Sequence, residues 1–438
     1  MQQTFEIVVI GGGPAGIAAA VAASQSSKRV AVLDDNPRVG GQIWRGGPGL
    51  AQPKAAARWF YQLETANVRV FNGARVIHAD ASARTLQAET TREIFPIGYQ
   101  NLILATGARE LFLPFPGWTL PNVMGAGGFQ ALVKSGLPIA GKRVVVAGTG
   151  PLLLAVAAYL CDHGANVARI CEQASSSSLA AFALRMLAFP GKLREALSLR
   201  YKSRFAKYAT QSWPVSAHGK ISLESITISE SGRLREIPCD YLACAFHLIP
   251  NTELPRMLGC HLNQEAFVET DELQQTLHQG IYCAGEPTGI GGVELSTIEG
   301  RIAGHAAAND KRAAAKLFPA RARYRKLAAA MKQAFRLRPE LATLAKPDTF
   351  LCRCEDVTLH QVRQHNSWKS AKLHTRCGMG PCQGRICGAA ANFLFGWNIE
   401  SARPPVFPAR CESLAAISSL TSSLTTETEP PQFHGGFQ

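Results

Sequence analysis

The sequence lacks the segments that would export the chain or anchor it in a membrane. Its first residues, MQQTFEIVVIGGGPAG, contain no basic stretch followed by an apolar core and a small-residue cleavage site, so no secretory signal is indicated. Two apolar stretches, 7–24 and 144–161, approach the length of a membrane span, but glycines interrupt both, whereas a span needs about 20 residues of continuous helix. We therefore expect a cytoplasmic protein without a transmembrane segment, and leave peripheral membrane contact open.

The sequence also lacks a nucleic-acid recognition module and a disulfide scaffold. The formal net charge of +14 comes without interleaved aromatic and basic residues, so an anionic cofactor or an acidic partner explains it better than a nucleic acid. Twelve cysteines in 438 residues are too few for a disulfide scaffold, and those after Lys346 are clustered, which favours metal ligation. The histidines are scattered and none is an evident general base, so the catalytic residues stay unknown.

What the sequence does contain begins with two βαβ patterns. The first comprises a strand (6–10), a Gly-rich loop, an Ala-rich helix (14–25) and a strand (29–33), and the second runs from Arg143 to the strand 166–171. A further buried strand, 102–107, ends in Thr-Gly between them. Beyond the second unit we expect an irregular basic stretch (185–207), strands near 221–228, 241–246 and 281–284, and a helix at 295–307.

In the first loop, V-I-G-G-G-P-A-G, each glycine has a role in binding a dinucleotide. Gly11 permits the tight turn, Gly13 lets the backbone approach a pyrophosphate, and Gly16 lets the helix pack close to the sheet. The pyrophosphate would lie at the N-terminus of the helix. Asp34, at the end of the next strand, is placed to accept a hydrogen bond from the ribose 2′-OH, with Asp35 as the alternative register.

The second loop, G-T-G-P-L-L, departs from this pattern because Leu153 stands where the third glycine would be. An acid still ends the following strand and favours an unphosphorylated ribose, so the sequence predicts NAD or another adenine nucleotide. The predicted contacts are Gly148, Gly150, Pro151 and Glu172. The alternative is a domain kept for its architecture, with an empty pocket.

Three further motifs make the first part of the chain similar to the pyridine nucleotide-disulfide oxidoreductases. They are V-L-D-D-N-P-R-V-G-G-Q after the first unit, A-T-G at 105–107, and T-x-x-x-x-I-Y-C-A-G-E at 276–286, where Glu286 replaces the commoner aspartate. The resemblance implies FAD contacts at Gly11, Gly13, Pro14, Ala15, Gly16, Asp34, Gly41, Gln42, Thr106, Gly107, Gly285 and Glu286. Disulfide reductase activity is not expected, because the chain has no cysteine before Cys161.

Five cysteines near the C-terminus form a candidate metal site: Cys352, Cys354, Cys377, Cys382 and Cys387. Four thiolates suit either tetrahedral zinc or a [2Fe–2S] cluster. The first pair is Cys-x-Cys rather than the Cys-x-x-Cys usual in zinc ribbons, and a flavin on the same chain could feed an iron centre, so we favour the cluster. Spacing alone leaves the second ligand pair open, because four residues separate both possible pairs.

The segment T-R-C-G-M-G-P-C-Q-G-R-I-C resembles the [2Fe–2S] domain of bacterioferritin-associated ferredoxin in its flavoprotein-fused form. This resemblance implies that the ligands are Cys352, Cys354, Cys382 and Cys387, with Cys377 as a neighbouring free thiol or an alternative ligand. Glycines at 378, 380 and 384 would let backbone N–H groups approach the sulfurs and so tune the potential.

The fold implied is α/β, with two Rossmann-like dinucleotide-binding domains, the second inserted in the first. A small [2Fe–2S] domain like that of bacterioferritin-associated ferredoxin (BFD-like) follows them. The expected boundaries are 1–110 and 270–310 for the FAD domain, 111–269 for the second domain, 311–347 for a basic helical connector, 348–402 for the cluster domain, and 403–438 for a tail whose end, 425–438, is disordered. The connector's cations at 321, 323, 325 and 326 form either a solvated face or a contact with an anionic phosphate or partner.

This domain order resembles the larger (alpha) subunits of bacterial multi-subunit amine dehydrogenases, which include opine oxidases, D-hydroxyproline and proline dehydrogenases and hydrogen cyanide synthase. The resemblance implies an electron-transfer subunit beside an FAD-containing, amine-oxidase-like beta subunit, with a small third subunit and FMN at a subunit interface as further components to consider. One alternative is a self-contained NAD(P)H-dependent flavin and iron–sulfur reductase. Another is a structural nucleotide-binding subunit. The sequence names neither the amine oxidised nor the electron acceptor.

Overall fold

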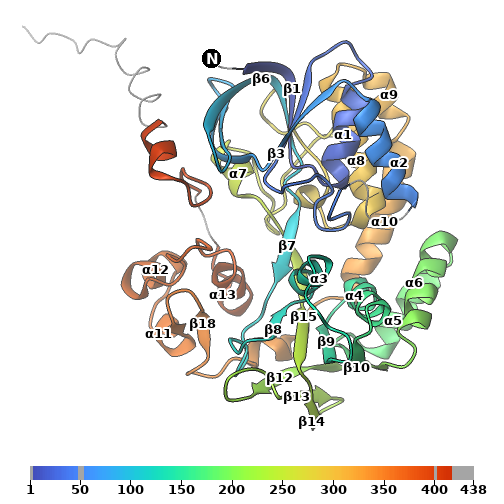
Figure 1. Cartoon of the computed structure of the whole chain (residues 1–438), viewed down its shortest axis with the longest axis vertical. Helices are drawn as coiled ribbons and strands as arrows, with labels where there is room; N and C mark the ends of the chain where they lie inside the picture. The colour runs from blue at the N-terminus through green and yellow to red at the C-terminus, as the bar shows by residue number, and fades with distance from the viewer. Residues whose placement is uncertain (1–2, 48–53, 399–401, 417–438) are drawn as a thin grey trace, which may run out of the picture.

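The protein is built from two α/β units that are connected by a pair of antiparallel strands, with a small cysteine-containing module beside them (Figure 1). The structure is a computed structural model that describes residues 3–47, 54–398 and 402–416. The predicted disordered end, 425–438, lies outside the described residues. No helix in the described part of the chain has the length and apolar character needed to cross a membrane.

The first unit is a mixed sheet covered on one face by helices. Its strands run in the order β3 (Val68–Asn72), β2 (Val30–Asp34), β1 (Gln3–Ile10), β6 (Ile94–Leu104), β5 (Thr85–Glu89) and β4 (Arg75–Asp80), and β17 (Ile281–Cys283) pairs with β6. Strand β1 is parallel to both neighbours, with Val8 opposite Ala31 and Leu102. The carboxyl ends of the parallel strands therefore meet at one edge, where the Gly-rich loop begins.

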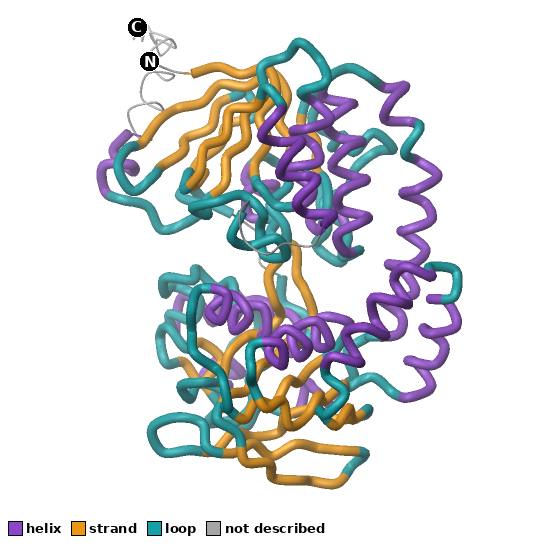
Figure 2. Tube along the Cα trace, turned by 45° about the vertical axis from the view of Figure 1, so that its right-hand side comes forward, coloured by secondary structure: helices purple, strands orange, loops and turns teal. Residues whose placement is uncertain are grey.

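Helices α1 (Pro14–Ala23), α2 (Lys54–Thr65) and α8 (Gly292–Ala307) lie side by side against the first sheet (Figures 1 and 2). Alanines fill most of α1, and glycines on α8 let the two helices approach closely. A Cβ atom at Gly300 would lie only 2.1 Å from the carbonyl oxygen of Ala15. This close packing fixes the N-terminus of α1 relative to the loop after β17.

The second unit contains a parallel sheet in the order β11 (Lys207–Ala209), β10 (Asn166–Glu172), β9 (Arg143–Gly148), β15 (Tyr241–Ala245) and β8 (Val123–Gly125). Helices α3 (Ala126–Lys134) and α4 (Pro151–Asp162) share an apolar core with it. A separate apolar core joins the sheet to the antiparallel strands β12 (Ser212–His218), β13 (Ser225–Glu230) and β14 (Arg233–Pro238).

The chain passes to the second unit through β7 (Ala108–Leu111) and returns through β16 (His247–Pro250), and these strands pair antiparallel. The second domain is therefore inserted in the first. Its end corrects the predicted boundary at 269, because α7 (Glu253–Met257) and the loop that follows pack with the first sheet. Leu254, Leu258 and Val268 share an apolar core with Leu102 and Leu104. The second domain thus ends near the return strand.

The predicted irregular stretch at 185–207 is wrong, because most of it is helical. Helix α5 (Ser176–Met186) begins at Ser175, whose hydroxyl accepts a hydrogen bond from the N–H of Ser178. Helix α6 (Pro190–Lys202) starts with a proline at its first position, where the missing N–H leaves no hydrogen bond unmade. The Pro190–Gly191 pair thus begins a helix.

The basic connector is helical, as predicted, and consists of α9 (Lys311–Ala315), α10 (Phe318–Ala334) and a 3-10 turn (Pro339–Thr343). Its arginines are not simply a solvated face. Arg321 is buried and donates to the carbonyl of Glu272 at 2.5 Å and to Gln274 Oε1 at 3.1 Å. Arg325 pairs with the buried Glu299 of α8 at 2.9 Å. Arg321 stabilises the first domain from within, and Arg325, which is 47% exposed, pairs with the buried Glu299 from the surface.

We expect Arg321→Met to lower the free energy of unfolding by about 2–3 kcal/mol, because the buried Gln274 Oε1 and the partly buried Glu272 carbonyl lose a charged donor. Chemical denaturation followed by circular dichroism measures the change. Lys326→Met, on the exposed face of the same helix, is the control and should stay within about 0.5 kcal/mol of the natural protein. Equal stability of the two variants would contradict the internal role of Arg321.

The cysteine module contains β18 (Phe350–Cys352), β19 (Val357–Thr358), α11 (Leu359–Arg363), α12 (Trp368–Thr375) and α13 (Cys387–Phe395). The indole N–H of Trp118 in the second unit donates to the carbonyl of Phe350 at 2.7 Å. After the module, the segment 402–416 returns to the first unit, where the Val406 N–H donates to the Ile77 carbonyl at 2.9 Å. The module is therefore fastened to both units.

Candidate functional site

The first Gly-rich loop leaves room for an anion at the start of α1. The backbone of Gly13 has a φ of −76°, and no side chain caps the helix N-terminus. A Cβ atom on Gly13 would meet nothing nearer than the Cα of Gly41, at 3.9 Å. A hydrogen bond from the Gly40 N–H to the Gly12 carbonyl, 2.7 Å, holds the predicted Gly41–Gln42 turn beside the loop. These features suit a pyrophosphate bound by backbone N–H groups.

Asp34, rather than Asp35, faces this loop. Its Oδ2 accepts a hydrogen bond from the Gly12 N–H at 2.5 Å, and its Oδ1 accepts one from the Asn36 N–H at 2.7 Å. Burial raises the pKa of Asp34 above its ordinary value. Asp35 is exposed and lies 3.8 Å from Arg75. The structure therefore places Asp34 where the sequence predicted the ribose-binding acid.

A cavity of about 420 Å³ lies next to this loop. One of its lining residues, Val39, is also the residue that a Cβ atom on Gly12 would touch. The other lining residues come from α2, β3 and the turn after β2: Arg38, Leu63, Glu64, Val68, Val70 and Asn72. Valine and leucine side chains make up part of this lining, and such a surface suits the flat face of an adenine ring.

The other predicted flavin contacts lie at the same edge of the first sheet. Thr106 and Gly107 follow β6, and Gly285 and Glu286 follow the neighbouring strand β17. The Thr106 hydroxyl donates to the carbonyl of Asn251 at 2.7 Å, which ties this loop to the return strand β16. The structure thus brings together three loops that lie far apart in the sequence.

Glu286 is half-buried, and its Oε2 is shielded from solvent and has no hydrogen-bond partner among the described residues. Burial raises the pKa of Glu286 to about 7, and the negative charge of Glu299 adds to the effect. Glu299 itself accepts hydrogen bonds from the Thr288 hydroxyl at 2.9 Å and from Arg325. A buried carboxyl oxygen without a partner is a place for a ligand hydroxyl to donate a hydrogen bond.

The pKa of Glu286 predicts how stability depends on pH. An unfolded glutamate ionises near its ordinary value of 4.5, whereas the folded protein keeps the proton until about 7. The folded protein therefore binds more protons between these values, and stability falls as the pH rises through this range. We expect Glu286→Gln to remove this loss and to make flavin-free protein more stable by up to about 3 kcal/mol above pH 7.5. Thermal melts of both proteins at pH 5 and pH 8 test this, and a difference that does not grow with pH would contradict it.

The second Gly-rich loop uses its acid internally. Glu172 is fully buried and accepts hydrogen bonds from the Thr149 hydroxyl at 2.7 Å, the Gly150 N–H at 2.8 Å and the Ala174 N–H at 2.9 Å. The amide of the next residue, Gln173, bonds to the connector through the Arg336 carbonyl and the Arg338 N–H, both at 3.1 Å. Glu172 stabilises this loop, and the connector lies beside the end of β10.

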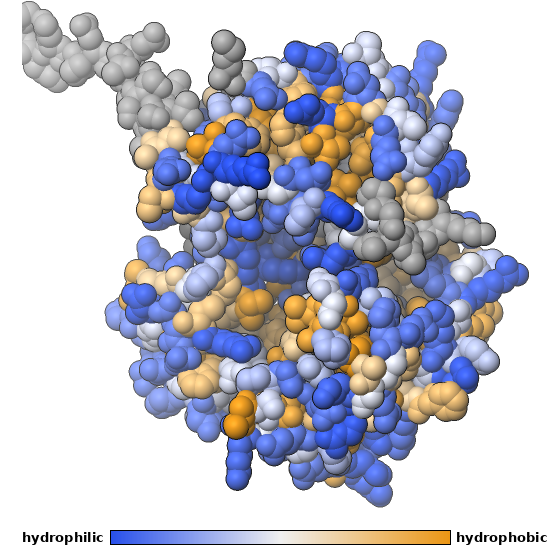
Figure 3. Space-filling view, viewed as in Figure 1, coloured by the Kyte–Doolittle hydropathy of each residue, from blue (hydrophilic) through white to orange (hydrophobic). Residues whose placement is uncertain are grey.

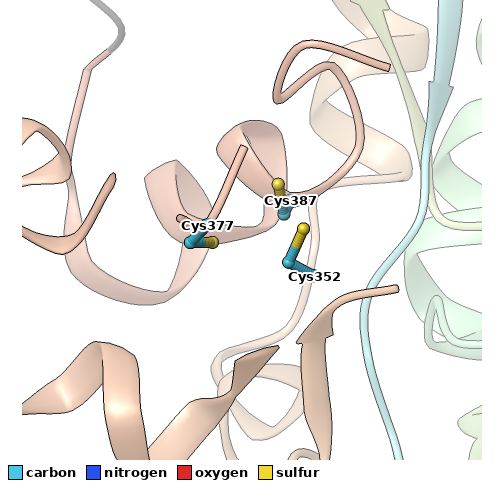
Figure 4. Close-up of side chains that lie close together, drawn as sticks. All are labelled: Cys352, Cys377 and Cys387. Atoms are coloured by element: carbon cyan, nitrogen blue, oxygen red, sulfur yellow. The ribbon is translucent and has the colours of Figure 1, made fainter. Parts of the chain in front are cut away.

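Three of the five cysteines, Cys352, Cys377 and Cys387, point toward one another in the small module (Figure 4). The sulfurs of Cys352, Cys377 and Cys387 lie within 4.8 Å of one another, and all three residues are buried. Cys354 and Cys382 lie nearer the surface, with their sulfurs 3.8 Å apart. Cys387 connects the two groups, since its thiol contacts those of Cys352, Cys377 and Cys382. The structure therefore groups the alternative ligand Cys377 with two of the predicted ligands, while the other two, Cys354 and Cys382, form an outer pair that Cys387 contacts.

Hydrogen bonds between the thiols spread their pKa values widely. Contacts with the Cys377 and Cys387 thiols lower the pKa of Cys352 to about 2, and the contact with Cys387 lowers that of Cys382 to about 5. The contact with Cys352 raises the pKa of Cys377 to about 12. Burial raises the pKa of Cys354, and the contact with Cys352 raises that of Cys387, so only Cys352 and Cys382 are favoured as the thiolates that bind soft metals.

Backbone N–H groups also donate to the sulfurs, from Gly378 to Cys352 and from Gly384 to Cys382. Gly378 and Gly384 thus place N–H groups against cysteine sulfurs, and their effect on the potential of a cluster stays a prediction. Gly380 serves a different purpose, because a Cβ atom there would lie 2.3 Å from the Cβ of Cys354. It allows the two cysteine loops to pack together.

Sequence reasoning missed Glu299 and Arg385, and it left open whether Arg325 of the connector is solvated or contacts an anion. Glu299 of α8 accepts hydrogen bonds from Thr288 in the loop after β17 and from Arg325 of α10, and no local pattern marks this pair. The position of Arg385 between Cys382 and Cys387 could have marked it, and it donates to the Cys382 carbonyl at 3.3 Å.

The surface is hollowed between the upper and lower parts of the molecule, and mainly hydrophilic residues line the hollow (Figure 3).

Two dinucleotide-binding units, the second inserted in the first through an antiparallel strand pair, define the class of two-domain flavin and pyridine-nucleotide oxidoreductases. The sequence profile of the pyridine nucleotide-disulphide oxidoreductase family matches residues 5–310, and the chain belongs to this family. The first domain and its loop geometry place it among the FAD-dependent oxidoreductases.

The chain is 30% identical to the A component of opine oxidase from Rhizobium meliloti, over 98% of this chain and 90% of that protein. It is also 30% identical to the HcnB subunit of hydrogen cyanide synthase from Pseudomonas protegens, over 87% of this chain and 89% of that protein. Among solved structures, L-proline dehydrogenase from P. horikoshii shares the fold with a TM-score of 0.66 at 19% identity, covering 94% of this chain and 80% of that one. The predicted resemblance to the larger subunits of such enzymes is confirmed.

Proposed function

We propose that this chain is the electron-transfer subunit of a heteromeric dehydrogenase that oxidises an amino acid, an opine or another secondary amine. In this proposal FAD binds at the first Gly-rich loop, and a [2Fe–2S] cluster binds at the cysteine module. A second, amine-oxidase-like subunit takes a hydride and a proton from the CH–NH unit of the substrate, leaving an imine. The two electrons then leave singly to an external acceptor, for which a redox dye serves in the assay.

The single observation that carries this proposal is the convergence of five thiols beside a flavin fold. Cys352, Cys377 and Cys387 meet within 4.8 Å, and Cys382 joins them to Cys354. Zinc is the alternative for such a thiol set. The cluster is the better match, because the thiols belong to a chain of an oxidoreductase family.

The first loop suits FAD for reasons independent of the resemblance. The space at Gly13 accepts a pyrophosphate, and the cavity beside Val39 accepts an adenine ring. The partnerless Oε2 of Glu286 is ready to accept a hydrogen bond from a hydroxyl group of the cofactor. FAD, when bound, supplies a two-electron centre, and the cluster a one-electron centre.

The second loop supports an architectural role better than an NADH site. Glu172 has no exposed surface, whereas Asp34 of the first loop keeps 4%, and the connector bonds to the neighbouring Gln173. A self-contained NADH-dependent reductase would need this acid for the ribose. An adenine nucleotide at the N-terminus of α4 remains part of the proposal.

The relatives are named as subunits, which supports a partner for this chain. The test is to purify the chain anaerobically with the products of adjacent genes, and to measure FAD, iron and inorganic sulfide. Amino acids, opines and glycine are then screened for dye reduction. We expect iron and sulfide in equal amounts and activity only with a second flavoprotein present. Rapid flavin bleaching by NADH in the isolated chain would instead favour the reductase.

A further inference from the structure

Three charged residues meet where the two units and the cysteine module come together. Arg109 lies on β7, Glu253 begins α7, and Arg385 lies in the loop between Cys382 and Cys387. We call Arg109, Glu253 and Arg385 the crossing cluster. Neither the FAD site nor the cysteine set explains why an acid and two arginines lie there.

One carboxylate links the two arginines. Glu253 Oε1 lies 2.8 Å from Arg109 Nη1 and 3.8 Å from Arg385 Nε. Arg109 also donates to the carbonyl of Arg385 at 3.3 Å. The side chains are 15–26% exposed, so water screens these charges less than those of an ordinary surface pair.

The crossing cluster reaches both predicted cofactor sites. On the flavin side, Arg109 donates to Asn251 Oδ1 at 2.8 Å, and Asn251 is bonded to the backbone and hydroxyl of Thr106. On the cysteine side, Arg385 Nη1 donates to the Cys382 carbonyl at 3.3 Å. Its Nη2 donates to the Val406 carbonyl at 2.5 Å, which fixes the guanidinium.

A fixed cation at this place has a definite electrostatic consequence. A [2Fe–2S] cluster with four thiolate ligands is an anion, and it gains one more negative charge on reduction. Net charge and hydrogen bonding around the ligands set the reduction potential of such clusters. A nearby guanidinium favours the reduced form, whereas a carboxylate that partly offsets it favours the oxidised form.

We propose that Arg385 is a positioning residue that raises the reduction potential of the cluster, and that Glu253 moderates this effect while Arg109 holds both in place. The proposal rests on the proposed function, because it needs a cluster at the cysteine module. It explains the opposite charges of the crossing cluster: the arginines draw electrons toward the module, and the acid limits how strongly they are held.

The test is a redox titration of the anaerobically purified complex, with the cluster followed by electron paramagnetic resonance. Arg385→Gln should shift the equilibrium toward the oxidised cluster by about tenfold, which is a potential about 59 mV lower for a one-electron centre. Glu253→Gln should shift it in the opposite direction, because a negative charge is removed. Arg385→Lys keeps the charge and should fall between Arg385→Gln and the natural protein.

Arg363→Gln is the matched control, since it removes the same charge from an exposed position on α11 of the module. It should shift the equilibrium less than about threefold. An Arg385→Gln protein that keeps its iron and its potential would overturn the proposal, as would shifts of the same sign in Arg385→Gln and Glu253→Gln. If Arg385→Gln loses iron, the sign of the Glu253→Gln shift decides.

The two proposals fail differently. Natural protein that contains no iron–sulfur cluster defeats the proposed function, and with it this inference. If the natural protein contains the cluster but Arg385→Gln and Glu253→Gln leave its reduction potential unchanged, only the role of the crossing cluster is contradicted.

Discussion

We expect Cys387→Ser to lose most of its iron and the visible absorption of the centre, while Cys377→Ser keeps both nearly intact. The resemblance to the BFD-like domain assigns Cys387 as a ligand and leaves Cys377 free. The packing adds a reason for the large effect, because the Cys387 thiol contacts three of the other thiols and connects the buried group to the outer pair. Iron and sulfide analysis of anaerobically purified protein measures the loss.

A matched control for this experiment is Cys411→Ser, which changes an exposed cysteine outside the module. It should leave iron and absorption unchanged. Loss of iron in Cys377→Ser, with retention in Cys387→Ser, would move the ligand set toward the N-terminus of the loop. Zinc in place of iron and sulfide would leave the module a structural role.

Replacing Gly13 with valine should abolish FAD binding and leave the protein folded. The backbone φ of −76° is accessible to any residue, and a Cβ atom there meets no neighbour within ordinary contact distance except the Gly41 Cα at 3.9 Å. The side chain would instead fill the space that a pyrophosphate needs at the start of α1. Flavin absorbance per chain measures binding, and a thermal melt reports the fold.

The contrast with Gly16 makes this test selective. A Cβ atom on Gly16 would lie 1.7 Å from the carbonyl oxygen of Gly11, so Gly16→Val should prevent folding of the first unit. Asp34→Ala should weaken FAD binding without abolishing it, because only one or two hydrogen bonds to the ligand disappear. A Gly13→Val protein that stays stoichiometrically yellow would show that FAD binds elsewhere.

Local signals in the sequence predicted much of this molecule. The buried strands before Gly11 and Gly148, the helices after them and the acids that end the next strands all lie where expected, because each depends on residues within about 30 positions. Convergence of the five cysteines was also predictable, since two short loops carry them. The prediction of an irregular stretch at 185–207 was wrong, since α6 begins there with a proline, a residue that is also common at helix starts.

Features that depend on distant partners escaped prediction. Arg321 and Arg325 look like solvated cations in a basic helix, and only the fold shows that Gln274 and Glu299 lie beneath them. The internal role of Glu172 depends on hydrogen bonds within the loop that its position in the sequence does not reveal. Likewise, the crossing cluster combines residues that are far apart along the chain.

The segment 402–416 returns to the first unit and so restricts the motion of the cysteine module. Val406 bonds to Ile77 on one side and to Arg385 on the other, and the Ser413 hydroxyl donates to Glu89 at 2.6 Å. Hydrogen bonds at Phe350, before the cysteines, and at Val406 and Ser413, after them, hold the module against the two units. We therefore do not expect it to move as a mobile electron carrier. Electrons would cross a constant gap, so the rate of transfer within the chain should be insensitive to solvent viscosity.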